Sequence, residues 1–266
     1  MLKVISLGAG VQSTALLLMS LKGEVERADC AIFADTGWEP LAVYKCLEGL
    51  RKECEKEDFP LHIVSKGDIR QDCLDFLADP ENNKSRPSPP VFTDAGGPIV
   101  RTCTKDYKIQ PVNKKVREIL GLTGKRLRSV VAEVWFGITV DEIQRMKDNP
   151  QKWLVNKYPL IDLRMDRHNC AKWLERNWPH PVSKSACIGC PYHSNGAWRE
   201  MRDSDPDAFA DAVEFDGDIR KHPWPGVRGK VFLHRSGEPL GEVDFDNAED
   251  RGQLTFLDEC EGMCGV

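Results

Sequence analysis

Glycine and hydroxyl side chains follow the first apolar run of the chain, in the segment Ser6–Thr14 (SLGAGVQST). Gly8 and Gly10 allow positive φ and a close approach of other atoms to the backbone. A helix that begins after such a turn presents N–H groups that attract phosphate, and Ser13 and Thr14 would add hydroxyl donors. The spacing matches neither GxxxxGK[ST] nor the three-glycine dinucleotide fingerprint. The segment therefore predicts a phosphate-binding turn of another kind; a strand–helix turn without a ligand is the alternative.

Four of the ten cysteines form two close-spaced pairs. Cys187 and Cys190 enclose a glycine and precede Pro191, and Cys260 and Cys264 form the second pair. Four thiolates suit tetrahedral zinc and a [4Fe–4S] cluster equally well, and a proline after a cysteine is typical of iron–sulfur loops. We therefore predict one metal centre on these four cysteines. Four reduced thiols without metal, and Cys260 as a nucleophile of lowered pKa, are the alternatives.

The remaining cysteines lie apart from one another. Five are isolated in apolar or helical stretches, where cysteine usually serves as a small core residue: Cys30, Cys46, Cys54, Cys73 and Cys170. Cys103 stands in a polar turn instead. It could be a metal ligand, a thiol that acts on sulfur, or an unreactive side chain.

The composition excludes several classes of protein. The 266 residues carry a net charge of -5, with 41% hydrophobic and 30% charged residues. No stretch approaches the ~20 apolar residues that span a bilayer, and there is enough apolar surface to argue against a largely disordered chain. The acidic balance argues against a generally basic nucleic-acid coat. Because the N-terminal segment lacks the pattern of a secretory signal, we expect a cytoplasmic protein in which structural disulfides are uncommon.

Strand and helix patterns alternate along the first half of the chain. Short apolar runs predict strands at 3–7, 28–34, 61–64 and 129–137. Helical spacing predicts helices at 13–21, 41–55 and 69–77, and one at 105–120 that is interrupted near Pro111. Strands separated by helices imply βαβ units, so the fold class expected is α/β with a parallel, Rossmann-like sheet.

The second half of the chain has a different pattern. After Pro159 helices and loops follow one another, with a hairpin expected at Gly229–Phe245. We therefore predict a nucleotide-binding α/β domain at 1–160 and a C-terminal helical, Cys-rich, metal-binding portion at 161–266.

Three segments that are far apart in sequence are expected on one rim of this sheet. They are Gly8–Ser13, Asp35–Glu39 and the segment after Gly137. Each follows a predicted strand, and ligands of open parallel sheets bind beyond the carboxyl ends of the strands. A carboxylate such as Asp35 at that edge favours a functional role, although it could also begin the next helix as a simple N-cap.

Several of these segments resemble, in order, motifs of the PP-loop (N-type ATP pyrophosphatase) superfamily, in its phosphoadenylyl-sulfate (PAPS) reductase-like branch. Gly8–Ser13 is similar to the SGGKDS pyrophosphate loop, and Asp35–Glu39 (DTGWE) to the DTG-x-E segment. Cys103 with Lys108 and Pro111 is similar to C-x-x-x-x-K-x-x-P. Further resemblances lie in the G-x-x-x-x-E-x-x-R stretch Gly137–Arg145, in Tyr158–Asp162, and in the C-x-x-C segment Ser185–Arg199.

The resemblance implies an adenine nucleotide alpha hydrolase-like fold that binds ATP or an adenylated sulfate. It implies adenine held by backbone near Phe33–Ala34, and polar contacts from Asp35 and Arg145, with Mg²⁺ at Asp35. Val11 and Gln12 stand where the family loop has Lys and Asp, so backbone groups and Ser13 would hold the phosphates. The nucleotide-binding residues expected are Gly8, Ala9, Gly10, Gln12, Ser13, Thr14, Phe33, Asp35, Lys105 and Arg145, and the catalytic ones are Asp35 and Cys103.

A local excess of basic residues lies between Asn113 and Ser129. It consists of Lys114, Lys115, Arg117, Lys125, Arg126 and Arg128. The interpretation that we favour is a solvated helix face with a polar turn. A track for the phosphates of a nucleic-acid acceptor, tRNA or DNA, is the alternative.

Together these features predict an enzyme that couples ATP-dependent adenylation to sulfur transfer with an iron–sulfur cluster. The resemblance to sulfur-transferring relatives favours [4Fe–4S] over Zn²⁺ on Cys187, Cys190, Cys260 and Cys264. A thiol-dependent reductase of phosphoadenylyl or adenylyl sulfate is the second hypothesis. A non-catalytic nucleotide-binding module with structural zinc is the third. The sequence leaves the acceptor, the sulfur donor and a homodimer open.

Overall fold

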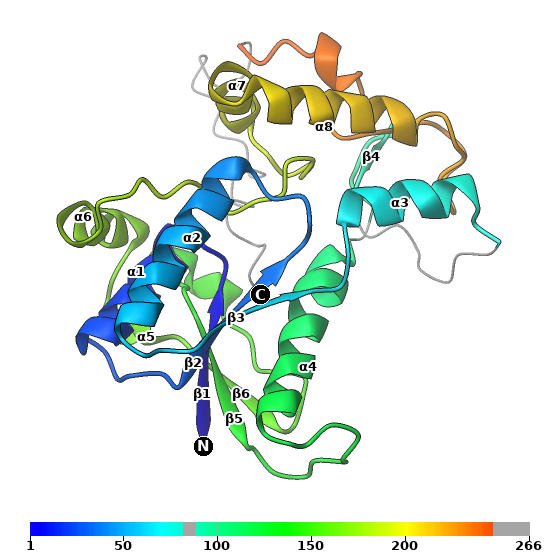
Figure 1. The fold of residues 1–266 in the computed structure, drawn as a ribbon. Coiled ribbons are helices and arrows are strands. Elements are labelled where there is room, and N and C mark those ends of the chain that lie inside the picture. The colour runs from blue at the N-terminus through cyan, green and yellow to red at the C-terminus, as the bar shows by residue number, and fades with distance from the viewer. Residues whose placement is uncertain (82–88, 100, 247–266) are drawn as a thin grey trace.

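The computed structural model describes residues 1–81, 89–99 and 101–246, and it is built on a parallel sheet of five strands (Figure 1). The strands are β1 (Leu2–Leu7), β2 (Cys30–Asp35), β3 (Leu61–Ser65), β5 (Ala132–Phe136) and β6 (Leu154–Lys157). Their order across the sheet is β3-β2-β1-β5-β6. The chain adds β2 and β3 on one side of β1 and then β5 and β6 on the other side, so the order of the strands reverses between β1 and β5. The fold is α/β and Rossmann-like, as predicted, and ligands of such sheets bind at this reversal point.

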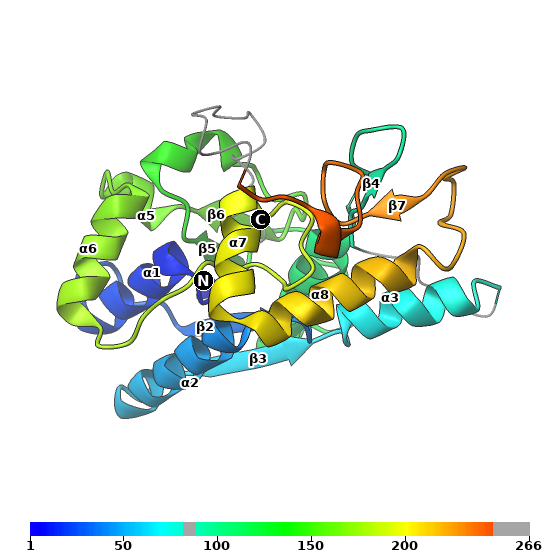
Figure 2. The ribbon, with the colours of Figure 1, turned by 90° about the horizontal axis from the view of Figure 1, so that it is seen from above.

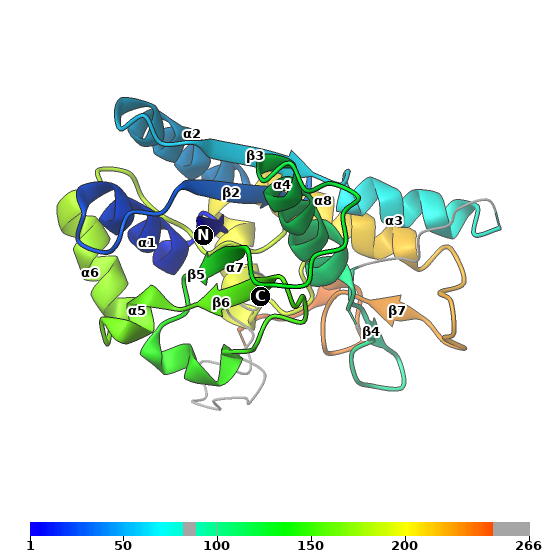
Figure 3. The same ribbon diagram turned by 90° about the horizontal axis from the view of Figure 1, so that it is seen from below.

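Helices cover both faces of the sheet (Figures 1 and 3). On one face, Ile5, Phe33 and Trp135 are buried against α1 (Val11–Lys22), α2 (Leu41–Lys56) and α6 (Arg167–Asn177). On the other face, Val4, Ile32 and Val134 are buried against α4 (Gln110–Ile119). Neighbouring residues of a strand point to opposite faces, so a sheet covered twice requires the nearly continuous apolar runs that this sequence has.

A third core lies beyond the carboxyl ends of the strands, where Figure 2 shows α7 and α8. It contains α3 (Ile69–Ala78), α7 (Asn195–Ser204) and α8 (Pro206–Ile219). Phe215 and Trp198 are fully buried in it. Two short strands, β4 (Phe92–Thr93) and β7 (Val231–Phe232), pair there in antiparallel fashion. The remaining helices are α5 (Pro159–Asp162), a π-helix (Thr104–Ile109) and 3-10 turns at Val140–Arg145 and Leu240–Glu242.

The four predicted strands are confirmed, with ends that shift by a few residues, whereas β6 was not predicted. The expected hairpin at Gly229–Phe245 is wrong, because β7 pairs with β4 from far earlier in the chain. The helix expected at 105–120 begins as a π-helix and becomes α4 at Gln110, just before Pro111. The division of the chain at residue 160 stays a prediction. In the part of the chain that the structure describes, no helix is long and apolar enough to cross a membrane.

Candidate functional site

The glycine turn joins β1 to α1 at the reversal point of the sheet. Gly10 is the N-cap of α1 and has φ −94°, and the residue of the turn in the left-handed region is Ala9, with φ 54°. Ser13 Oγ accepts a hydrogen bond from the Gly8 N–H at 3.2 Å. A Cβ at Gly10 would lie 3.1 Å from the Cβ of Ser185. Gly10 is therefore required for close approach, as expected, and not for positive φ. A non-glycine residue in the left-handed region is uncommon and is often found at functional sites.

A cavity of about 100 Å³ opens against this turn; we call it the glycine-loop cavity. Gly8, Gly10, Gln12 and Ser13 form one wall. Three cationic side chains line the same cavity: Arg145, Arg167 and Lys184. No carboxylate of the described residues lines it. Backbone N–H groups at a helix N-terminus and several cations around one cavity make a site for a multiply charged anion.

Arg145 is held in place by a buried ion pair. Its guanidinium lies 2.8 Å from a carboxylate oxygen of Glu142, and only 9% of its side chain is exposed. Gln12 Nε2 donates to the other oxygen of Glu142 at 3.1 Å. Burial raises the pKa of Glu142, and the Arg145 guanidinium opposes this rise. The pair is therefore not the solvated surface pair that its spacing would also allow, and it fixes Arg145 beside the glycine turn.

A second cavity, of about 240 Å³, lies next to the first; we call it the apolar cavity. Most of its lining surface is apolar, with contributions from Phe33, Val112, Val134 and Phe136 on β2, α4 and β5, and polar and charged residues also line it. The two cavities share four lining residues: Ser6, Gly8, Phe136 and Ser185. A flat apolar group and a charged group of one molecule could therefore occupy neighbouring cavities at the same sheet edge.

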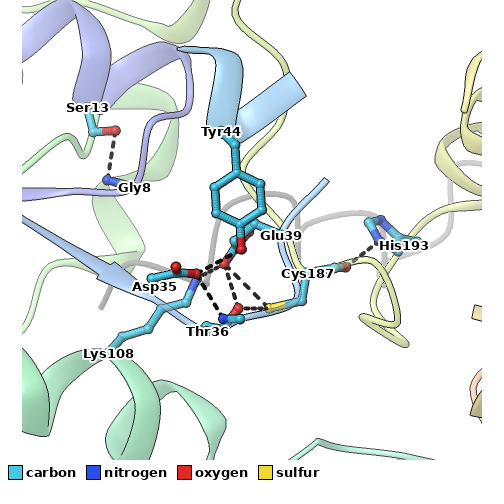
Figure 4. A network of polar contacts seen from close by, with 10 residues as sticks. Gly8, Ser13, Asp35, Thr36, Glu39, Tyr44, Lys108, Cys187 and His193 are labelled. Carbon is cyan, nitrogen blue, oxygen red and sulfur yellow. Dashed lines mark hydrogen bonds and ion pairs between the residues drawn. The ribbon is translucent and has the colours of Figure 1, made fainter. Parts of the chain in front are cut away.

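A third, small cavity is lined by Cys103, Cys187 and Cys190; we call it the cysteine cavity. Cys190 lines the glycine-loop cavity as well. Figure 4 shows that Cys187 lies beside Thr36 and Glu39, which follow β2. The Sγ atom of Cys187 is 3.3 Å from Thr36 Oγ1 and 3.6 Å from Glu39 Oε1. The turn Cys187–Cys190, which we call the cysteine turn, is thus in direct contact with the residues that follow β2.

The described residues alone do not form a metal centre. Within them, no three His, Cys, Asp or Glu side chains converge in a way that could hold a metal ion. Cys187 and Cys190 line one cavity, but Cys260 and Cys264 lie outside the described residues. The chemistry of the donors suits zinc or iron. The four-cysteine centre therefore stays a prediction.

Several predicted nucleotide-binding residues line the cavities, and others do not. Gly8, Gly10, Gln12, Ser13 and Arg145 line the glycine-loop cavity, and Phe33 lines the apolar cavity. Ala9 and Thr14 are fully buried, and Lys105 is exposed on the π-helix. None of these last three lines a cavity described above.

Asp35, predicted as a catalytic residue, makes local contacts at the end of β2. Its Oδ1 accepts hydrogen bonds from the Gly37 N–H at 2.8 Å and from the Tyr44 hydroxyl at 2.9 Å (Figure 4). Burial and this carboxylate raise the pKa of Tyr44. Asp35 lines none of the three cavities, and its visible contacts are those of a residue that shapes the turn before α2.

Five side chains that complete the cavities were not among the predicted site residues. Glu39 and Lys108 line the apolar cavity, and Lys184, Ser185 and Arg167 line the glycine-loop cavity. Glu39 and Lys108 belong to motifs that carried the resemblance, so the signal was present for both. Lys184 and Ser185 precede the C-x-x-C turn, and no local pattern connects them with a phosphate.

The isolated cysteines are core residues, as predicted. The Cys30, Cys46, Cys54, Cys73 and Cys170 side chains are all buried. Burial raises the pKa of the Cys30 thiol to about 11 and those of Cys54, Cys73 and Cys170 to about 12. Thiols with such values are protonated at neutral pH and unreactive.

Comparison with known proteins finds similarity to solved structures but none to a family model or a curated sequence. The phosphoadenylyl-sulfate (PAPS) reductase from Candida auris, solved as a phosphate complex, is similar in structure with a TM-score of 0.42. The two chains are 17% identical, and the similarity covers 68% of this chain and 75% of that one. With this TM-score and this identity, the similarity assigns neither a family nor a chemistry to the chain.

Proposed function

We propose that the protein is a nucleotide-dependent enzyme that binds the phosphates of ATP in the glycine-loop cavity and the nucleoside in the apolar cavity. The observation that carries this proposal is the pairing of the two cavities. One is lined by Arg145, Arg167 and Lys184, the other has a mostly apolar surface, and Gly8 and Ser185 line both. A nucleotide has the same division into a charged and a flat apolar part, which supports this ligand over a purely apolar or purely anionic one.

The reaction that we propose has two steps. A carbonyl-type oxygen of the acceptor attacks the α-phosphorus of ATP, the bond to the bridging oxygen breaks, and pyrophosphate leaves. A sulfur nucleophile of the hydrosulfide or persulfide class then attacks the activated carbon, and the carbon–oxygen bond breaks so that AMP leaves with the oxygen. Arg145, Arg167 and Lys184 would stabilise the charge that grows on the pyrophosphate. Cys190, which lines the same cavity, brings a sulfur side chain next to the phosphate site.

The sulfur chemistry is proposed for the cysteine turn. Cys187 and Cys190, with Cys260 and Cys264, would hold the iron–sulfur cluster, and zinc is the alternative metal. When bound, a cluster of this kind can carry or activate sulfur. Cys103 lines the same cavity as the first pair and is a candidate for direct contact with the sulfur species.

The acceptor that we propose is a nucleic acid, because exposed basic residues could bind its phosphates. Lys114, Lys125, Arg126 and Arg128 are exposed on α4 and the loop that follows it. Arg117 has a structural role instead, because its guanidinium lies 4.6 Å from the centroid of the Trp153 ring and donates to the Lys125 carbonyl. The exposed residues could follow a phosphate backbone, and binding would then weaken steeply with salt.

Calorimetric titration with ATP tests the proposal. We expect ATP to bind, and Arg145→Met to weaken it by about tenfold, since one charge-assisted contact to phosphate would be lost. Arg51→Met is the matched control, because Arg51 pairs with Glu48 on the surface of α2 and lines no cavity described here. Absence of ATP binding to the unaltered protein, or equal affinity of Arg145→Met, would contradict the proposal.

Product analysis tests the reaction. ATP cleavage should yield AMP and pyrophosphate in the presence of the acceptor, and no sulfite should form from adenylyl sulfate. Sulfite release without ATP cleavage would indicate a reductase instead. Nucleotide binding with neither product, in a protein that contains zinc and no iron, would indicate a non-catalytic module.

A further inference from the structure

The charges that line the two cavities differ. The glycine-loop cavity presents three cationic side chains, of which Arg145 is paired with Glu142, and among the described residues no carboxylate lines it. The apolar cavity presents two positively charged side chains, Lys108 and Lys147, and two negatively charged ones, Glu39 and Asp148. A cavity with balanced charges offers no net attraction to an anion, so phosphate groups are favoured at the glycine-loop end only.

Glu39 is the buried member of this set. Only 1% of its side chain is exposed, although it lies on the wall of the apolar cavity. Its Oε1 accepts a hydrogen bond from Thr36 Oγ1 at 3.0 Å and lies 3.6 Å from the Lys108 Nζ. Its Oε2 has no hydrogen-bond partner among the described residues. A buried carboxylate oxygen without a donor is unfavourable, so this wall favours a ligand that brings a neutral donor such as a hydroxyl group.

We propose that the apolar cavity selects a nucleotide with free ribose hydroxyls, in which phosphates extend from the 5′ position alone. This inference rests on the proposed function. A ribose hydroxyl could donate to Glu39 Oε2, whereas a phosphate on that hydroxyl would remove the donor. It would also bring a second anion against the buried Glu39 carboxylate, which already pairs with Lys108. Rejection of a partner by like charge is a common source of specificity. The substrate class is then ATP or adenylyl sulfate, and 3′-phosphorylated nucleotides such as phosphoadenylyl sulfate are excluded.

Two ligands that differ only in one phosphate test this selection. AMP and adenosine 3′,5′-bisphosphate are titrated separately into the full-length protein in a calorimeter. We expect AMP to bind at least about tenfold more tightly, because like charges brought together oppose binding of the bisphosphate. The test is stringent, since a basic site without selection would favour the more highly charged bisphosphate. Equal or tighter binding of the bisphosphate would overturn the inference and leave the proposed function intact. If neither ligand binds, the inference fails, and the titration with ATP described above decides separately whether the proposed function fails.

The variant Glu39→Gln tests the residue. Glutamine has the same size without the charge, so the preference for AMP should fall by about tenfold, mainly through tighter binding of the bisphosphate. Glu48→Gln on α2 changes the net charge equally, lies outside the apolar cavity, and should keep the preference. If Glu39→Gln does not fold, Asp148→Asn at the exposed side of the same cavity should reduce the preference in the same direction. An unchanged preference in a folded Glu39→Gln protein overturns the role of Glu39.

The hydroxyl contact has its own test. At least one of 2′-deoxy-AMP and 3′-deoxy-AMP should bind about tenfold more weakly than AMP, because a buried acceptor is then left without its donor. The Glu39→Gln variant should show a smaller difference between AMP and the same deoxynucleotide. Affinities of both deoxynucleotides equal to that of AMP would show that no ribose hydroxyl contacts Glu39.

Discussion

Two walls enclose the glycine-loop cavity, and they are held in different ways. The sheet wall consists of the glycine turn and Phe136–Ile138, which follow neighbouring parallel strands. Its parts are joined by backbone pairing, with Ser6 opposite Phe136. Gly137 also packs directly against the start of α1, since a Cβ at Gly137 would lie 2.6 Å from the Ser13 nitrogen. The register of the sheet therefore fixes this wall.

The loop wall, Lys184–Ser194, has no strand partner in the described part of the chain and depends on individual contacts. The Ile188 N–H donates to the Trp38 carbonyl at 2.9 Å. A Cβ at Gly189 would lie 2.0 Å from the Trp38 ring. Near the end of the loop wall, the centroids of the His193 and Trp198 rings are 4.7 Å apart. The wall proposed to bind phosphate is therefore held by the sheet, whereas the wall that carries Cys187 and Cys190 depends on long-range packing.

The largest effect is expected where the two walls touch. Gly10→Val places methyl groups against Ser185, whose Cβ would lie 3.1 Å from the new Cβ. The walls must then separate or the turn must shift, and we expect nucleotide affinity to fall by about 100-fold or more. Calorimetry with ATP measures this loss. Gly217→Ala is the control, since a Cβ there meets no atom within 4 Å, and its affinity should stay unchanged. A Gly10→Val protein that binds ATP normally would show that the close contact is not required.

Deletion of residues 260–266 tests the predicted metal centre. It removes Cys260 and Cys264 together, so the protein should lose its metal and melt at a lower temperature, because metal binding contributes to folding. Elemental analysis after anaerobic purification and calorimetric melting measure both effects. Cys46→Ala, which removes a buried core thiol, should keep the metal. Full metal content in the truncated protein would refute the four-cysteine centre and favour a nucleophilic role for Cys260.

Gly189→Ala tests how the loop wall is held. The added methyl group would overlap the Trp38 ring, whose nearest atom is 2.0 Å from the new Cβ. Overpacking of this kind typically lowers the free energy of unfolding by about 1–3 kcal/mol, which urea denaturation can measure. Nucleotide affinity should fall less than in Gly10→Val, because the sheet wall is unaltered. Equal stability of Gly189→Ala and Gly217→Ala would mean that the cysteine turn is not packed as described.

The smallest effect concerns the contact that anchors α7, which begins directly after the loop wall. His234 Nε2 lies 3.1 Å from Asn195 Oδ1, and burial lowers the pKa of His234 to about 4. In the unfolded chain this histidine binds a proton near pH 6.5, so folding loses stability as the pH falls below that value. Between pH 7 and 5.5 we expect a loss of about 1 kcal/mol from this group. His234→Gln should reduce the pH dependence of urea unfolding by this amount; an unchanged slope would contradict the assignment.

The sheet wall could be predicted from the sequence because its signals are local. Apolar runs at β1, β2 and β5 are separated by helical patterns, and parallel strands place the residues after each strand at one edge. The sequence therefore predicted that Gly8–Ser13, Asp35–Glu39 and the segment after Gly137 lie at one edge of the sheet. It did not reveal which side chain of Asp35–Glu39 faces the cavity. Turn geometry decides this, and it directs Asp35 to Gly37 and Tyr44 and leaves Glu39 on the cavity wall.

Three features are predictable from the sequence: the α/β class, the buried role of the isolated cysteines, and the position of the glycine turn at the sheet edge. Each of these follows from periodicity or composition within a short segment. Three other features depend on the tertiary structure: Lys184 and Ser185 line the glycine-loop cavity, Arg145 is buried with Glu142, and β7 pairs with β4. Some of these contacts join segments that are distant in the chain, and others depend on which side of a turn a residue faces. A local sequence pattern does not specify the partner of a residue in either case. The packing of the whole chain selects such contacts, because only there do buried charges and close backbone approaches find their counterparts.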